Sequence, residues 1–229
     1  MTSIAENIAR VKANIEKAAC GRQVKLLAVS KTFPNEAIEE ALGAGQLCFG
    51  ENYAQEGAVK VDYFTEYHPN IPIEWHFIGP LQSNKTRIVA ERFQWVQSIS
   101  RLKIAERLSQ QRPLSMPPLN ILVEVNIDDE ESKSGVRAEE LQALLADLAP
   151  LPNLCLRGLM CIPRAQANMT EKHRTFAKMK KLFDECVDRG YAFDTLSMGM
   201  SADYECAIEE GATLVRVGSS IFGARTYSK

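Results

Sequence analysis

The feature that most constrains the fold of this 229-residue chain is a regular alternation of short β-branched runs with longer segments of helical periodicity. Strands that alternate with helices pair in parallel through helical crossovers. Eight strands are predicted, at 24–31, 47–51, 73–79, 95–100, 119–127, 155–162, 195–200 and 214–218. Helices are predicted between them, at 34–43, 52–65, 83–92, 101–110, 138–148, 170–189 and 202–210. This pattern predicts one α/β domain over residues 1–229, folded as a single (β/α)8 barrel of the TIM type.

A further helix is predicted before the first strand, over residues 3–19, where it would cover the floor or the rim of the barrel. The alternative architecture is an open, doubly wound sheet. The absence of a glycine-rich fingerprint after the first strand disfavours that alternative.

Composition narrows the class of function. A formal net charge of -2 argues against nucleic-acid binding through phosphate neutralisation. No apolar run reaches the roughly 18 residues that a membrane span requires. The first 20 residues lack the continuous apolar core of a signal peptide. We therefore expect a cytoplasmic protein with no membrane and no nucleic-acid partner.

The metal-binding residue types are scattered along the sequence. None of the six cysteines forms a C-x-x-C pair, and the three histidines, His68, His76 and His173, do not cluster. Reduced cysteines are expected in a chain without an export signal. The sequence predicts no metal site.

Lys31 ends the first predicted strand, directly before Thr32-Phe33-Pro34. In barrels of this type the active site lies at the carboxyl ends of the strands. Burial disfavours the charged form of an amine and makes it available as a nucleophile toward carbonyls. The alternative is a lysine that marks the strand end and extends to solvent.

Glycine- and serine-rich turns follow the last two predicted strands. Gly199, Met200 and Ser201 end the seventh strand, and Gly218, Ser219 and Ser220 follow the eighth. Such barrels often bind phosphate with these two loops and a helix N-terminus. Gly199 is expected to let the backbone approach an anion closely.

Arg216 lies two residues before Gly218 on the eighth strand, which neighbours the first strand in a closed barrel. Strand alternation places Arg216 inside the barrel, close to Lys31. A second buried cation would lower the pKa of the lysine further. A lysine, a phosphate cradle and an arginine together indicate pyridoxal 5′-phosphate, with the arginine at the ring nitrogen. The alternative is a cofactor-free aldolase that forms a Schiff base with a phosphorylated carbonyl substrate.

Six strings occur in the order found in a known family, and they cover essentially the whole chain. They are Leu27–Thr32, Phe49–Tyr53, Trp75–Lys85, Arg157–Met160, Ser197–Ser201 and Val215–Gly223. On these strings the chain resembles the pyridoxal phosphate homeostasis proteins. That family looks like the barrel half of alanine racemase standing alone.

The resemblance implies that Lys31 is the cofactor lysine and that Arg216 faces the pyridine nitrogen. It implies that Asn52 lies near the ring. It also implies phosphate contacts from Met200, Ser201, Gly218 and Ser219. His76 is either a pocket residue or a satisfied core histidine. A second basic site near Lys133 is associated with the family, although a solvated loop lysine is the simpler interpretation of Lys133.

The resemblance further implies a carrier that buffers and delivers pyridoxal phosphate, with apo-enzymes as partners and no catalytic turnover. Racemisation needs an acid/base group on each face of the substrate carbon, and the barrel leaves no second domain to supply one. An arginine at the ring nitrogen also makes the ring a poorer electron sink. The alternative function is a pyridoxal phosphate-dependent racemase or decarboxylase. No heptad or large apolar stripe indicates assembly, so a monomer is expected.

Overall fold

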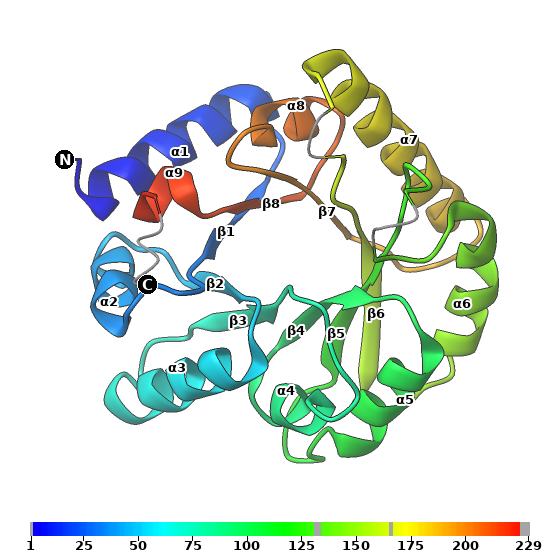
Figure 1. Cartoon of the computed structure of the whole chain (residues 1–229), viewed down its shortest axis with the longest axis horizontal. Helices are drawn as coiled ribbons and strands as arrows, with labels where there is room; N and C mark the ends of the chain where they lie inside the picture. Colours follow the sequence, from blue (N-terminus) through cyan, green and yellow to red (C-terminus); the bar gives the residue numbers. More distant parts are fainter. Residues whose placement is uncertain (1, 131–133, 165–166, 225–229) are drawn as a thin grey trace.

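The computed structural model describes residues 2–130, 134–164 and 167–224. Its centre is a closed barrel of eight parallel strands in sequence order, with β8 hydrogen-bonded to β1 (Figure 1). The strands are β1 (Lys25–Val29), β2 (Cys48–Glu51), β3 (Glu74–Phe77), β4 (Trp95–Ile99), β5 (Leu119–Glu124), β6 (Leu154–Met160), β7 (Thr195–Met200) and β8 (Leu214–Val217). The predicted TIM-type fold is confirmed. Lys133 lies outside the described residues.

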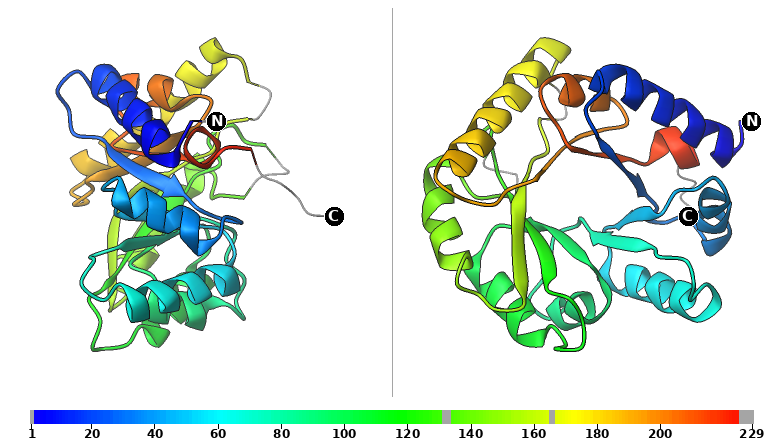
Figure 2. Two further views of the ribbon diagram at one scale, coloured as in Figure 1. Left: turned by 90° about the vertical axis from the view of Figure 1, so that its left-hand side faces the viewer. Right: turned by 180° about the vertical axis from the view of Figure 1, so that it is seen from behind.

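Helices surround the barrel in a ring (Figures 1 and 2). They are α1 (Ile4–Ala19), α2 (Asn35–Gly43), α3 (Ala54–Tyr67), α4 (Thr86–Arg92), α5 (Leu102–Gln111), α6 (Leu141–Leu148), α7 (Met169–Asp188), α8 (Tyr204–Glu209) and α9 (Ser219–Phe222). None of the helices within the described ranges is long and apolar enough to cross a membrane.

The alternation of side chains along each strand divides the core into two layers. Outward-facing residues such as Ala28, Phe49 and Val217 pack with the helices in one continuous cluster. Inward-facing residues form smaller clusters inside the barrel. One contains Leu27, Cys48 and Leu214, and another contains Trp95, Leu122 and Met160.

Helix α1 stands in the outer ring, and Ile15, Glu16 and Ala19 near its end also line a cavity at the amino ends of the strands. It packs beside α2, α8 and α9 (Figure 2). Its start is fixed by a capping box in which the Ser3 hydroxyl accepts from the Glu6 N–H and the Glu6 carboxylate accepts from the Ser3 N–H. The Asn7 amide, buried in this helix, donates to the Ile221 carbonyl of α9 at 2.9 Å.

Two predicted boundaries differ in ways that affect the site. Strand β1 ends at Val29, not at residue 31, so Lys31 begins a turn. The short helix α9, which directly follows β8, was not predicted, because four residues are too few to show a helical period.

Candidate functional site

The turn that carries Lys31 is held in place from helix α3. The Ser30 N–H donates to the Gly50 carbonyl on β2, which continues the strand pairing by one residue. Thr32 then adopts a left-handed φ of 67°, and its N–H donates to Glu56 Oε1 at 2.6 Å. A non-glycine residue in this conformation indicates a turn that its surroundings enforce. The half-buried Lys31 side chain thus starts from a fixed backbone.

The fully buried lysine at this strand end is Lys60, not Lys31. Lys60 Nζ lies 2.9 Å from Glu51 Oε1, 2.7 Å from Glu56 Oε1 and 2.8 Å from the Ser30 carbonyl. The Ser30 hydroxyl also donates to Glu51 at 2.6 Å. Burial raises the pKa of Glu51, and the ammonium of Lys60 opposes that rise. This cluster ties β1, β2 and α3 together directly behind Lys31, and sequence analysis missed it.

Arg216 is buried inside the barrel, as predicted from strand alternation. It pairs in register with Leu27 of β1, on the same interior layer. One guanidinium nitrogen donates to Ser197 Oγ at 2.6 Å, and another donates to the Cys161 carbonyl at 2.9 Å. Burial lowers the pKa of Arg216 from its usual value, while Glu124 acts in the opposite direction. Burial likewise raises the pKa of Glu124, and Arg216 opposes that shift.

A chain of hydrogen bonds crosses the barrel interior from Arg216. The Ser197 hydroxyl donates to Gln97 Oε1 at 2.6 Å, and Gln97 Nε2 lies 2.8 Å from His76 Nδ1. His76 Nε2 lies 2.7 Å from Glu74 Oε1. With a proton on Nε2, every donor along this chain points away from Arg216 and toward Glu74. Its contacts with Ser197 and with the Cys161 carbonyl fix the Arg216 guanidinium at two of its nitrogens.

The two glycine- and serine-rich turns meet at Ser201. The Ser201 hydroxyl lies 3.2 Å from the Gly218 N–H and 3.5 Å from the Ser220 N–H. These are donors from the loop after β8 converging on an acceptor from the loop after β7. Gly218 also packs against Val29 of β1. The cradle formed by Ser201 and the Gly218–Ser220 turn therefore lies at the strand end that continues into Lys31.

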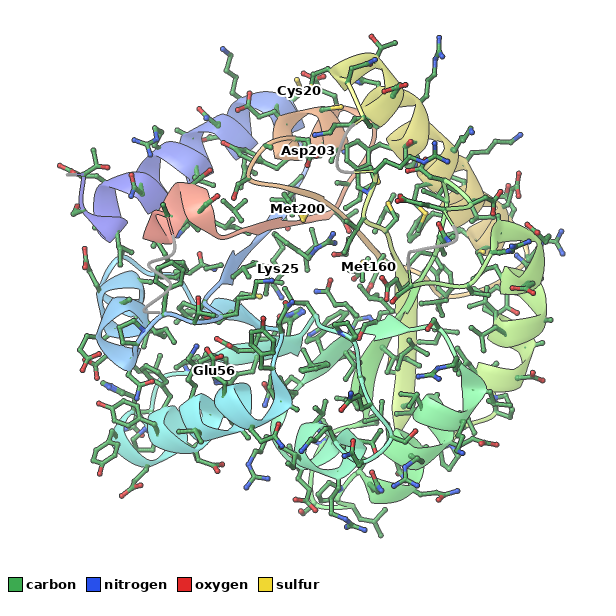
Figure 3. The ribbon with its side chains drawn as sticks, in the orientation of Figure 1. Cys20, Lys25, Glu56, Met160, Met200 and Asp203 are labelled. Atoms are coloured by element: carbon green, nitrogen blue, oxygen red, sulfur yellow. The ribbon has the colours of Figure 1, made fainter. Side chains whose placement is uncertain are left out.

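Gly199 has a packing role that the sequence did not indicate. Its φ is 93°, and a Cβ atom there would lie 2.6 Å from Ala207 Cβ. Gly199 is therefore needed for close packing against α8. Its role in the approach of an anion stays a prediction. Met200, which follows it, donates its N–H to Asp203 Oδ1 at 2.7 Å, and Asp203 pairs with Lys172 at 2.9 Å. Figure 3 shows Met200 and Asp203 along this connection.

Asn52 and His76 lie in different parts of the barrel. Asn52 follows β2 at the carboxyl end of the barrel. Its backbone packs closely on Gly79, because a Cβ atom added to Gly79 would lie 2.1 Å from the Asn52 carbonyl oxygen. His76 lies within the strands, fully buried, and stacks on Trp95 with ring centroids 4.9 Å apart. Burial lowers the pKa of His76, and Glu74 opposes that shift. His76 is thus a hydrogen-bonded core histidine.

Known proteins resemble this chain in sequence and in structure. The family described as "Alanine racemase, N-terminal domain" matches residues 1–226. The pyridoxal phosphate homeostasis protein of Vibrio cholerae is 53% identical over 234 residues, which cover 100% of this chain and 99% of the relative. The protein of that name from Escherichia coli K12 is 52% identical over 234 residues, with both chains covered completely.

Among solved structures, PipY of Synechococcus elongatus "with PLP bound" has a TM-score of 0.85 at 33% identity and covers 96% of this chain and 100% of its own. Alanine racemase of Corynebacterium glutamicum has a TM-score of 0.73 at 18% identity. That likeness covers 98% of this chain and 62% of the racemase, and it shows a shared fold.

Proposed function

Because this chain belongs to the pyridoxal phosphate homeostasis proteins, within the family of the alanine racemase N-terminal domain, we propose that it binds pyridoxal 5′-phosphate and serves its intracellular homeostasis. The protein holds the cofactor as a Schiff base on Lys31 and releases it again, which buffers the reactive aldehyde. In the Schiff-base step the lysine amine adds to the aldehyde carbon and one water leaves. Its reversal by water restores both partners.

The observation that carries this proposal is the convergence of three neighbouring strand ends. Lys31 follows β1, the buried Arg216 lies on β8, and the Ser201 turn follows β7. These supply an amine, a fixed guanidinium and a set of backbone N–H donors within one barrel end. That combination suits an aldehyde, a pyridine ring nitrogen and a phosphate on one small molecule.

The phosphate group is assigned to the turns after β7 and β8, with contacts from Ser201, Gly218 and Ser219. Met200, which was also expected to contact the phosphate, donates its N–H to Asp203 Oδ1 instead. The Gly218 N–H already donates to the Ser201 hydroxyl oxygen, so its donor is aimed at an acceptor in the cradle. A phosphate oxygen is a stronger acceptor than a hydroxyl and would take over that role. Asn52, at the carboxyl end of β2, is assigned to the cofactor ring.

Arg216 is the reason to propose a carrier without catalytic turnover. Its guanidinium stays charged in proteins and is held by Ser197 and Cys161. It can donate a hydrogen bond to an unprotonated ring nitrogen, but it cannot accept one from a protonated ring nitrogen. Pyridoxal phosphate serves enzymes as an electron sink, and an unprotonated ring nitrogen weakens that ability. The alternative, a racemase or decarboxylase, requires the opposite electronic arrangement or a further acid/base pair.

The remaining parts of the proposal concern the setting of the protein. We propose that residues 1–229 act as one domain, as a monomer in the cytoplasm. Apo-enzymes that use pyridoxal phosphate are its proposed clients. Neither a nucleic acid nor a membrane is needed for this role.

The test is a titration of the purified chain with pyridoxal phosphate, followed by visible absorption. We expect a band from the protein-bound Schiff base at one cofactor per chain. The band should be lost in Lys31→Ala and kept in Lys178→Ala, which removes an exposed lysine of α7. A panel of amino acids offered to the loaded protein should yield no racemised or decarboxylated product. Turnover would favour the enzyme alternative, and a full band in Lys31→Ala would refute the assignment of Lys31.

A further inference from the structure

A second group of reactive side chains lies at the opposite, amino-terminal end of the barrel. Cys48 begins β2 and Glu74 begins β3, and the two residues are paired in register. His76 follows two residues later on the same interior face. We propose that Cys48, Glu74 and His76 bind one divalent cation of the zinc class, with a fourth coordination position open to a cavity at the barrel floor.

The three ligand atoms are already close to the spacing that a tetrahedral site needs. Cys48 Sγ lies 3.3 Å from His76 Nε2 and 3.5 Å from Glu74 Oε1. Zinc bonds of about 2.3 Å to sulfur and about 2.0–2.1 Å to nitrogen or oxygen place tetrahedral ligands about 3.3–3.6 Å apart. His76 Nε2 and Glu74 Oε1, now 2.7 Å apart, are the pair that must separate. The proton between them is the one that a metal ion would replace.

The plane of the His76 imidazole is fixed beside the other two ligands. His76 stacks on Trp95 with an interplanar angle of 7°, and its Nδ1 lies 2.8 Å from Gln97 Nε2. A metal-bound imidazole carries its proton on the other nitrogen and donates it to an acceptor. Turning the Gln97 amide over presents its oxygen to Nδ1 without moving the backbone. The Ser197 hydroxyl, which now donates to Gln97 Oε1, would then accept from the Gln97 NH2 group. Gln97 can therefore serve the ring in both states.

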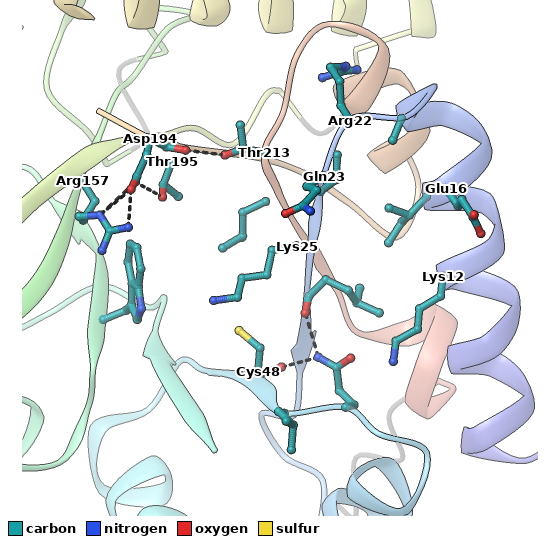
Figure 4. A pocket seen from close by; sticks show the side chains of 18 of the residues that line it. Lys12, Glu16, Arg22, Gln23, Lys25, Cys48, Arg157, Asp194, Thr195 and Thr213 are labelled. Carbon is teal, nitrogen blue, oxygen red and sulfur yellow. Dashed lines mark hydrogen bonds and ion pairs between the residues drawn. The ribbon is translucent and has the colours of Figure 1, made fainter. Parts of the chain in front are cut away.

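Access to the cluster comes from a cavity of about 870 Å³ that is lined by residues at the strand starts. Lys25 and Cys48 both line it, and Figure 4 shows their side chains projecting into it. Trp95, whose indole ring covers His76, lines the same cavity, and its buried Nε1 has no partner within the described ranges. A water completing the coordination would add a hydrogen-bond acceptor to this region.

Lys25 is the residue that competes with the metal. Its Nζ lies 2.5 Å from Glu74 Oε1, so an ammonium holds the carboxylate in the structure. The Lys25 side chain is 47% exposed and can move into the cavity when a metal ion takes its place. Removing the ammonium should therefore tighten metal binding rather than weaken it.

The ligand types select the class of metal. A thiolate and an imidazole favour zinc and its analogues over magnesium or calcium, which prefer oxygen ligands. Sequence spacing predicted no metal site, because Cys48 and His76 are separated by a whole β–α–β unit. Their pairing depends on the register of two strands.

The test uses the full-length chain, stripped of metal and free of pyridoxal phosphate, titrated with Co²⁺ as an optical probe and with Zn²⁺ as its competitor. We expect one Co²⁺ per chain, a thiolate-to-cobalt charge-transfer band, and displacement by Zn²⁺. Cys48→Ser should abolish the band and weaken Zn²⁺ binding at least about tenfold. Cys20→Ser, which removes an exposed thiol elsewhere, should change neither.

Two further variants test the site independently in case Cys48→Ser does not fold. His76→Gln should weaken Zn²⁺ binding without removing the thiol, and Lys25→Gln should strengthen it several-fold. Circular dichroism of each variant confirms the fold. Absence of the band in the native chain, its persistence in Cys48→Ser, or unchanged affinity in Lys25→Gln would overturn the proposal. Because no cofactor is present, these outcomes are independent of pyridoxal phosphate binding.

Discussion

Arg216 and Ser197, on the neighbouring strands β8 and β7, are joined by a 2.6 Å hydrogen bond inside the barrel. This contact connects the guanidinium assigned to the cofactor with Gln97, His76 and Glu74 across the interior. The carboxyl end of the barrel is thus linked to its floor through side chains that all have partners. Arg216 should be correspondingly rigid.

Ser197→Ala should loosen Arg216 and weaken cofactor binding. Loss of a hydrogen bond to a charged group costs about 1.5–3 kcal/mol. Urea unfolding should report a stability loss of that order, and a titration should report weaker pyridoxal phosphate binding. Ser109→Ala is the matched control, because Ser109 is also buried and donates to the Pro152 carbonyl outside the barrel. A stability loss in both variants with equal cofactor affinity would contradict a positioning role for Ser197.

The barrel and the position of Lys31 were predictable from the sequence because both depend on local patterns. Eight alternations of strand and helix indicate the closed sheet, and a lysine at a strand end is visible in the primary structure. Arg216 followed from strand order and side-chain alternation. These predictions needed no knowledge of individual contacts.

The supporting residues were not predictable, because their partners come from distant segments. Gln97 and Ser197 are 100 residues apart and meet only inside the closed barrel. Lys60 has the spacing of an ordinary helix residue, and only the packing of α3 on β2 reveals its burial. The contact of Gly199 with α8 is not visible in the sequence either, because it depends on how the helix packs on β7.

The stability of the fold should depend much more on the Lys60 amine than on the Lys31 amine. Lys60→Met leaves Glu51 charged and buried without its main partner, which should destabilise the fold by about 3–5 kcal/mol. Lys31→Ala should change the unfolding free energy of the cofactor-free protein much less, because the Lys31 side chain is only half-buried. Urea unfolding of both variants without cofactor measures the difference. Equal losses would contradict the distinct roles given to these lysines.

Gly199→Ala should be destabilising by about 1–3 kcal/mol, because it combines a left-handed φ with a steric clash. The clash is with Ala207 on α8, at 2.6 Å from the added Cβ. Gly43→Ala, at a helical position with no atom within 4 Å of the added Cβ, should be neutral or stabilising. Thermal unfolding of the two variants tests the contrast. A stable Gly199→Ala protein would show that α8 does not pack tightly on β7.

Protonation of Asp194 should account for part of the stability that the protein loses at acid pH. Burial alone would raise its pKa, but the hydrogen bonds from Arg157 and Thr195 outweigh burial and lower it. A carboxylate with a lowered folded-state pKa stabilises the fold above its unfolded pKa, about 3.9, and loses that contribution as the pH falls through the folded-state value. Since Asp194 is largely exposed, Asp194→Asn should cost only about 0.2–1 kcal/mol at pH 7.

Asp194→Asn and the native chain should have the same free energy of unfolding once the pH is well below the folded-state pKa of Asp194. Urea unfolding across the acid range measures this convergence. Asp147→Asn, which changes an exposed aspartate of α6, controls for the loss of one negative charge. A stability difference for Asp194→Asn that does not shrink with acid would contradict the pairing with Arg157.

The most direct test of the central claim is to identify the lysine that holds the cofactor. The full chain is loaded with pyridoxal phosphate, reduced with borohydride so that the C=N bond becomes a stable C–N bond, digested, and sequenced by mass spectrometry. The phosphopyridoxyl group should be found on Lys31 in near-stoichiometric amount. An unmodified Lys31 at full cofactor occupancy, with the group on Lys60, Lys133 or another lysine, would contradict the account.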